Sequence, residues 1–317
     1  PCDKRYAALY RGARMSKRQP NDVSASVKSR LLNIARESGE EFNLLLIRYG
    51  IERLLYRLSK SGYADSFVLK GAILFRFRTD APHRPTRDVD LLSRGSSDVS
   101  GMEEIFRQVA RTEVINDGLT FDDSTVQAER IKEDQEYEGI RIHLEARLGT
   151  ARIRLQIDIG FGDAITPEPK KMDVPCILDF DAPRLSVYPW ETVVAEKYHV
   201  LVDLGMTNSR MKDFFDIRYM AREIGFNGAS LSKAIRATFE RRKTDIPDFR
   251  PVALSEHFSG DAAIRTRWLA FLRRSRLEAI DLQVVADEIW SFLEPVTSAL
   301  LSRKEFDKEW KPGGPWI

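Results

Sequence analysis

The spacing of apolar residues predicts two helices near the start of the chain. A polar, basic stretch over residues 1–20 comes first and is interpreted as an N-terminal extension. Asn21 or Asp22 can cap a helix that runs to about residue 37, because such side chains accept hydrogen bonds from the first free backbone amides of a helix. A second helix, over about residues 41–60, has apolar residues three or four positions apart.

Shorter elements are predicted in the middle of the chain. Residues 67–69 and 89–92 are typical of short strands, and residues 73–78 of a short helix between them. A loop with two prolines occupies residues 79–86, and a further helix is predicted over residues 101–109.

Strict alternation of apolar and polar residues predicts two longer strands, over residues 139–148 and 152–160. Gly149 and Thr150 between them suit a tight hairpin turn. A last strand is predicted near residues 185–188.

From Trp190 to about residue 301 the pattern is helical, and the tail after it is predicted to be irregular. We therefore expect a boundary near Pro189. The fold class is α/β (α+β), with a mixed domain over residues 21–189 and a helical domain over residues 190–317.

The composition restricts the classes of protein to which this chain can belong. The 317 residues are 43% hydrophobic, which suffices for about two domain cores, and no apolar run approaches the roughly 20 residues that span a membrane. The charged N-terminus has no apolar segment after it, so a secretory signal is not expected. The cysteines Cys2 and Cys176 form no disulfide framework. These features favour a cytoplasmic protein without a membrane partner.

The net charge of +2 conceals two basic clusters in the helical part. Their members are Arg241, Arg242 and Lys243 in one, and Arg265, Arg267, Arg273, Arg274 and Arg276 in the other. Each cluster is either a solvated face or a phosphate-binding patch.

Asp88 and Asp90 stand at the start of a predicted strand, two positions apart, so that their side chains point to the same face. Two carboxylates held this close repel each other unless a cation lies between them. Mg²⁺ binds through one or two carboxylates together with substrate phosphates, which makes it the cation we expect, with Mn²⁺ as a substitute.

Asp158 is an acidic residue in the middle of an apolar strand, a position where aspartate is disfavoured. It could complete a three-carboxylate site for two metal ions. It could equally be paired with a basic neighbour such as Arg154 or Arg147. Before these acids, the turn Lys70-Gly71-Ala72 joins a strand to a helix, where backbone amides could hold nucleotide phosphates.

Four stretches in this order resemble the AbiEii/AbiGii toxin family, which includes the mycobacterial MenT toxins. They are Phe67-Val68-Leu69-Lys70-Gly71-Ala72, Thr86-Arg87-Asp88-Val89-Asp90-Leu91, Asp158-Ile159-Gly160-Phe161-Gly162-Asp163, and Val194-Ala195-Glu196-Lys197 with Arg210-Met211-Lys212-Asp213-Phe214-Phe215-Asp216. The resemblance covers roughly residues 25–225. It implies a DNA polymerase β-like nucleotidyltransferase core with a mixed sheet, in a toxin of a type IV toxin–antitoxin pair.

The resemblance also implies roles for individual residues. Asp88 and Asp90 would bind metal, Asp158 would be the third carboxylate and metal ligand, Lys197 the catalytic or phosphate-binding lysine, and Asp213 an essential acid. On its own pattern, Lys197 could be an exposed lysine of a helix, and Asp213 part of a surface ion network.

The expected nucleotide-binding residues are Lys70, Gly71, Ala72, Arg87, Lys197 and Asp216. The family often has Gly-Gly-Thr, and the superfamily Gly-Ser, where this chain has Gly71-Ala72. Because Ala72 lacks a hydroxyl, only backbone contacts to a phosphate could survive at that position.

The implied reaction is attack by an acceptor hydroxyl on the α-phosphate of an NTP, with release of pyrophosphate. The resemblance implies an RNA acceptor, the tRNA 3′ end in MenT members, and a cognate antitoxin. Two alternatives stay open: a nucleotidyltransferase acting on a small molecule or protein, and an inactive nucleotide- or RNA-binding module.

Overall fold

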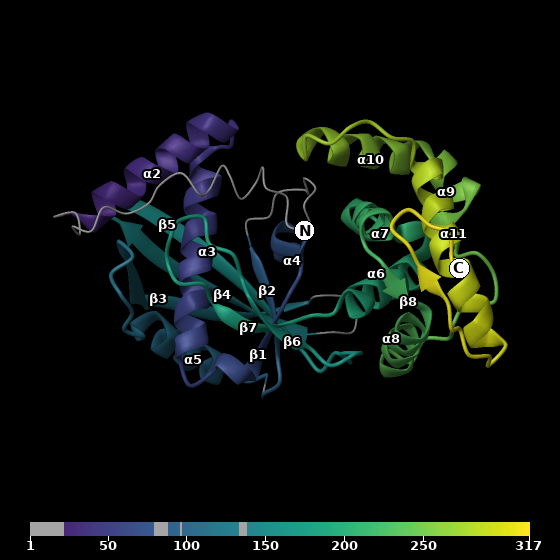
Figure 1. Cartoon of the computed structure of the whole chain (residues 1–317), viewed down its shortest axis with the longest axis horizontal. Helices are drawn as coiled ribbons and strands as arrows, with labels where there is room; N and C mark the ends of the chain where they lie inside the picture. Colours follow the sequence, from purple (N-terminus) through teal and green to yellow (C-terminus); the bar gives the residue numbers. More distant parts are fainter. Residues whose placement is uncertain (1–21, 79–87, 96, 133–137) are drawn as a thin grey trace. The chain divides into compact units, whose positions relative to one another are not determined.

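The computed structural model describes residues 22–78, 88–95, 97–132 and 138–317, without the side chains at 76–78, 132 and 138. The chain divides into two compact units (Figure 1). The first runs to Gly162 and resumes over Lys170–Val187, and the second comprises Asp163–Pro169 and Tyr188–Ile317. The predicted extension over residues 1–20 lies outside the described residues.

The first unit is built on a seven-stranded mixed sheet with the order β3-β4-β5-β2-β1-β7-β6. The strands are β1 Phe67–Lys70, β2 Val89–Ser93, β3 Leu119–Lys132, β4 Glu138–Leu148, β5 Ala151–Phe161, β6 Lys170–Asp173 and β7 Arg184–Val187. β2 pairs with β5, and β1 with β7, in parallel, and the other neighbours are antiparallel. The predicted mixed α/β class is confirmed for this unit.

The hairpin of β4 and β5 follows the predicted alternation. Ile153, Leu155, Ile157 and Ile159 of β5 are all buried. The turn places Gly149 at φ +58°, a backbone conformation that glycine adopts without strain. Leu148 pairs with Ala151 directly beside the turn, which sets the register of the whole hairpin.

Two strands of this sheet were not predicted. In β3 the pairing with β4 shifts between Asp122 and Gln127, and this bulge interrupts the alternation that would have revealed the strand. The edge strand β6 buries none of its four residues, so it carries no apolar signal.

Helices α2 (Val23–Ser38), α3 (Phe42–Lys60) and α5 (Val99–Arg111) belong to this unit, together with the short α4 (Ile73–Arg78) and the 3₁₀ turn η1 (Ala64–Ser66). Asp22 caps α2 by accepting a hydrogen bond from the amide of Ala25, as predicted. α3 packs on β5 at Gly50, where an added Cβ would lie 3.0 Å from the Leu155 side chain. The absence of a side chain at Gly50 therefore lets helix and sheet approach closely.

The core of the first unit also contains charged side chains. Arg53 and Arg57 both bind the carboxylate of Asp117, at 3.0 and 2.7 Å. Next to them, burial raises the pKa of Glu52 to about 7, although the amide of Ile177 donates a hydrogen bond to it. The two arginines therefore satisfy the buried carboxylate of Asp117, whereas Oε1 of Glu52 has no hydrogen-bond partner among the described residues.

The second unit is mainly helical, as predicted. Its elements are α6 Trp190–Leu204, η2 Gly205–Thr207, α7 Met211–Glu223, α8 Gly228–Arg241, η3 Val252–Leu254, α9 Glu256–Gly260, α10 Ala262–Arg274 and α11 Leu282–Leu301, with a two-stranded ribbon of β8 (Phe226–Asn227) and β9 (Glu309–Trp310). The tail is fixed by aromatic contacts, since Trp310 and Trp316 both pack on Phe292. Among the described residues, no helix has the length and apolar character needed to cross a membrane.

Candidate active site

A row of charged side chains crosses five strands of the sheet in the first unit. Directly paired residues of neighbouring strands form this row: Lys70 of β1, Asp90 of β2, Asp158 of β5, Arg141 of β4 and Glu129 of β3. Residues paired in this way project from the same face of a sheet. The two carboxylates that adjoin in the row therefore have a cationic residue on either side.

Asp90 is built onto the glycine turn. Gly71 has φ +80°, and a Cβ added to it would lie 1.8 Å from Oδ2 of Asp90. Any other residue at this position would collide with the carboxylate and strain the backbone. The glycine turn and Asp90 thus form one structural feature, and Asp88, two positions before Asp90 in the chain, is partly exposed.

Two of the other residues predicted at this turn are less accessible to solvent than Asp88 and Asp90. Lys70 and Ala72 are buried, and α4, which follows, has only six residues. Arg87 lies outside the described residues. The predicted phosphate contacts of this turn stay predictions.

Asp158 is held by two donors. Nε and Nη2 of Arg141 bind its two oxygens at 2.8 Å each, and Nε2 of Gln156 lies 3.2 and 3.3 Å from them. The expectation of a basic neighbour is confirmed, but the proposed partners were wrong. Arg154 stands opposite Glu145 in the hairpin and binds that residue instead.

More than one acidic residue raises the pKa of Arg141. Its hydrogen bond to Asp158 raises the pKa of the guanidinium, against the effect of burial, and the charges of Glu129 and Asp88 act in the same direction. Arg141 consequently stays cationic beside the carboxylates. Sequence reasoning missed this residue, although the register implied by the Gly149–Thr150 turn places it opposite Asp158.

A second cluster of candidate residues lies in the second unit, between α6 and α7. Nζ of Lys197 binds Asp213 at 2.6 Å and Asp216 at 2.9 Å. Nε of Arg210 binds the other oxygen of Asp213 at 2.6 Å. Both aspartate side chains have 0% exposure and that of Lys197 has 15%.

This burial corrects two sequence-based alternatives. Asp213 and Asp216 do not belong to a surface ion network, and Lys197 is not an exposed lysine, because the packing of α6 on α7 encloses them. Burial alone would raise the pKa of Asp213, but Lys197 and Arg210 outweigh it and hold that pKa below its usual value. Asp213 is therefore ionised.

The donor set for a metal ion can be judged from these contacts. Among the residues that the structure describes, no group of three or more His, Cys, Asp or Glu side chains is arranged to hold a metal. Asp88 and Asp90 are partly exposed and lie two positions apart, whereas Asp158 is bound by Arg141. This arrangement fits an ion that uses two carboxylates and completes its shell with substrate phosphates and water.

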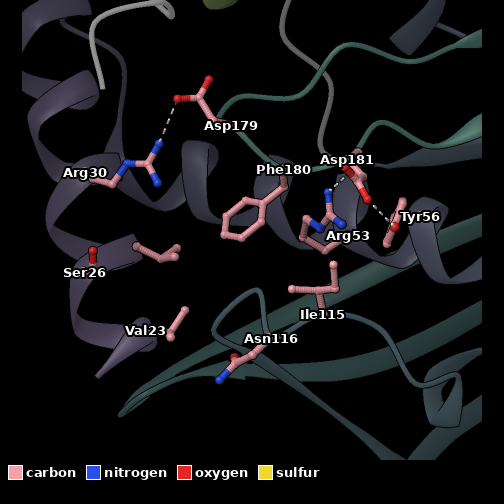
Figure 2. A pocket seen from close by; sticks show the side chains of 11 residues that line it. Val23, Ser26, Arg30, Arg53, Tyr56, Ile115, Asn116, Asp179, Phe180 and Asp181 are labelled. Atoms are coloured by element: carbon pink, nitrogen blue, oxygen red, sulfur yellow. Dashed lines mark hydrogen bonds and ion pairs between the residues drawn. The ribbon is translucent and has the colours of Figure 1, made fainter. Parts of the chain in front are cut away.

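A hollow of about 150 Å³ also lies in the first unit, beside α2 and α3 (Figure 2). Arg53 and Tyr56 bind Asp181 there, and Arg30 lies 3.8 Å from Asp179. None of the predicted site residues lines this hollow.

Comparison with known proteins yields matches among solved structures and families. Two structures from Helicobacter pylori match with 15% identity and a TM-score of 0.43: JHP933, over 79% of this chain and 90% of that chain, and a protein described as a candidate nucleotidyltransferase, over 80% and 95%. No curated protein matches the sequence. The profile of the family described as nucleotidyl transferase AbiEii toxin, type IV TA system, matches residues 53–296. Because this match spans more than half of the chain and includes both groups of candidate residues, the protein belongs to the AbiEii family of nucleotidyltransferase toxins.

Proposed function

We propose that this protein transfers a nucleotide from an NTP to an RNA acceptor, with the tRNA 3′ end as the preferred target, and thereby blocks translation and growth. The observation that carries the proposal is the pair of partly exposed carboxylates, Asp88 and Asp90, the second of which lies against the Gly71 turn. Family membership supports the nucleotidyl transfer, and the RNA acceptor is the further step.

Asp88 and Asp90 are the proposed ligands of a divalent ion, Mg²⁺ or Mn²⁺. When bound, such an ion supplies Lewis-acid stabilisation of the reacting phosphate. In the reaction the acceptor oxygen forms a bond to the α-phosphorus, the bond to pyrophosphate breaks, and the hydroxyl proton leaves to a base.

Asp158 is proposed as the third carboxylate, either as a metal ligand or as the group that activates the hydroxyl. Arg141 now binds each of its oxygens through one hydrogen bond, so either role would use the lone pairs that these bonds leave on the carboxylate.

Lys197 is proposed to neutralise charge on the triphosphate. Its ammonium group bridges Asp213 and Asp216, which fixes the position of the lysine side chain. The two aspartates are buried and therefore act through Lys197, as positioning residues. Backbone amides at Gly71 and Ala72, with Lys70 and Arg87, are the remaining proposed nucleotide contacts.

The test is incubation of the purified protein with Mg²⁺, each α-³²P-labelled NTP in turn, and total tRNA. Asp90→Asn is the inactive variant, and Asp173→Asn is its control, since Asp173 is an exposed acid that binds only Arg184 among the described residues. We expect label on tRNA with the native protein and the control, and none with Asp90→Asn.

Other outcomes would redirect the assignment. Label on a protein or small molecule, with tRNA unlabelled, would contradict the RNA acceptor and retain the enzyme. NTP binding without any labelled product would favour an inactive binding module, in keeping with the missing hydroxyl at Ala72. A type IV toxin also implies an antitoxin, which we expect to suppress the labelling when it is added.

A further inference from the structure

The segment from α10 to the turn after it has an unusual charge. Residues 262–276 contain five arginines, no lysine and no acidic residue. All five side chains are exposed: Arg265, Arg267, Arg273, Arg274 and Arg276. In a chain whose net charge is only +2, this is a strong local concentration of positive charge.

Four other arginines of the same unit bind acidic residues. Arg218 and Arg222 share Glu288, Arg242 binds Asp163, and Arg250 binds Asp287. Within the described part of the chain, no ion pair or side-chain hydrogen bond involves the five arginines of residues 262–276. No acidic side chain of the described residues compensates their charge, which is therefore available to an anionic partner.

The other side of α10 is buried in the core of the second unit. Ile264, Trp268, Phe271 and Leu272 are buried, and the indole of Trp268 donates a hydrogen bond to the carbonyl of Ile280. A basic helix that binds a membrane surface must insert its apolar face into the lipid. The buried apolar residues of α10 are covered by its own unit, so Leu269, which is 43% exposed, is the one large apolar side chain that this helix leaves beside its arginines.

Arginine is suited to phosphate because its planar guanidinium donates two parallel hydrogen bonds and stays charged. The 13 residues of α10 span roughly 20 Å, so the arginines can meet several phosphates of one strand. We propose that this surface, which we call the α10 arginine face, binds the phosphate backbone of the RNA acceptor. The choice of RNA rests on the proposed function, whereas the anionic partner follows from the charge.

The test compares three forms of the full chain. One carries Arg265, Arg267, Arg273 and Arg274 changed to Gln, and a charge-matched control carries Lys233, Lys304, Lys308 and Lys311, all exposed, changed to Gln. Affinity for tRNA is measured by filter binding from about 50 to 200 mM salt. Transfer of label from NTP to tRNA is measured on the same samples.

We expect the α10 variant to bind tRNA at least about 10-fold more weakly at low salt, with a salt slope reduced by roughly one for each lost phosphate contact. The control should bind as the native protein does. In transfer, KM for tRNA should rise while kcat at saturating tRNA is retained.

Equal tRNA affinity in the α10 variant and the control, with transfer intact in the native protein, would overturn the arginine face and leave the proposed function standing. Loss of affinity in the α10 variant, with no RNA labelled by the native protein, would retain the face and contradict the proposed function. Binding to phosphatidylserine vesicles as tight as to tRNA, and lost on the same substitutions, would overturn RNA as the partner.

Discussion

The two groups of acidic residues differ in how readily their carboxylates can exchange one bound group for another. In the first unit, Asp90 lies in β2 and Asp88 directly before that strand, and both are partly exposed. In the second unit, Asp213 and Asp216 have no exposed side-chain surface, and both bind Lys197. Carboxylates of the first kind can exchange water for a metal ion or a substrate, whereas those of the second kind are fixed by their burial.

This difference separates two roles that look alike in the sequence. A buried ion pair contributes little net stability, but the loss of one member leaves an uncompensated charge in the interior. Substitutions in the two groups should therefore have different consequences: in the first unit they change transfer alone, and in the second they also change folding.

The largest effect is expected for Asp90→Asn. It removes a proposed metal ligand and should lower nucleotidyl transfer by roughly 1,000-fold, about 4 kcal/mol of transition-state stabilisation. Thermal unfolding should change little, because the residue is partly exposed. Substantial transfer by this variant, or a large drop in its melting temperature, would contradict the proposed difference between the two groups of acidic residues.

The second prediction concerns Lys197→Met. It leaves Asp216 without its lysine and Asp213 with Arg210, and should destabilise the protein by about 3 kcal/mol or more in denaturant unfolding. Lys233→Met, at an exposed lysine of α8, serves as the control and should unfold as the native protein does. If both variants unfold alike, the cluster is not the buried ion pair that the structure shows.

A third prediction tests the contact between the glycine turn and Asp90. Gly71→Ala should lower transfer by roughly 100-fold, because the new Cβ would displace a carboxylate that lies 1.8 Å away. Gly39→Ala is a matched control, since Gly39 also has a positive φ, +69°, but open space around its Cβ position. Gly39→Ala should lose about 1 kcal/mol of stability through its positive φ. Gly71→Ala should lose more, because its Cβ also meets Cγ and Cβ of Asp90 at 2.6 and 2.8 Å, and it alone should lose activity.

The smallest predicted effect is a difference in pH dependence between the two units. Burial raises the pKa of Glu52 in the first unit to about 7, so the neutral form is favoured in the fold and stability is lost as pH rises from about 4.5 to 7. Burial and Arg242 lower the pKa of His199 in the second unit to about 4. Stability there is lost as pH falls from about 6.5 to 4.

Hydrogen exchange, followed by mass spectrometry for each unit from pH 4 to 8, measures both trends. Each should amount to on the order of 2–3 kcal/mol, because one pKa unit corresponds to about 1.4 kcal/mol. Glu52→Gln should flatten the trend in the first unit, and His199→Gln the trend in the second. A trend that persists in the matching variant would assign it to other groups.

The local sequence pattern predicts a large part of the candidate site. The alternation of β5 and the two-residue turn at Gly149–Thr150 predict the hairpin, and its register already places Arg141 opposite Asp158. The spacing of Asp88 and Asp90 predicts their common face. The strand β3 could not be found in this way, because its bulge moves the apolar residues out of phase.

The sequence by itself determined the class of the fold, the two carboxylates that follow the glycine turn, and the family to which the protein belongs. The tertiary structure alone decided that Lys197, Asp213 and Asp216 form a buried cluster, since their contacts depend on how α6 packs on α7. It also decided that Gly71 supports Asp90 and that the arginines of α10 face solvent. Periodicity shows which face of an element is buried, but the residues that meet there are set by packing between elements distant in the chain.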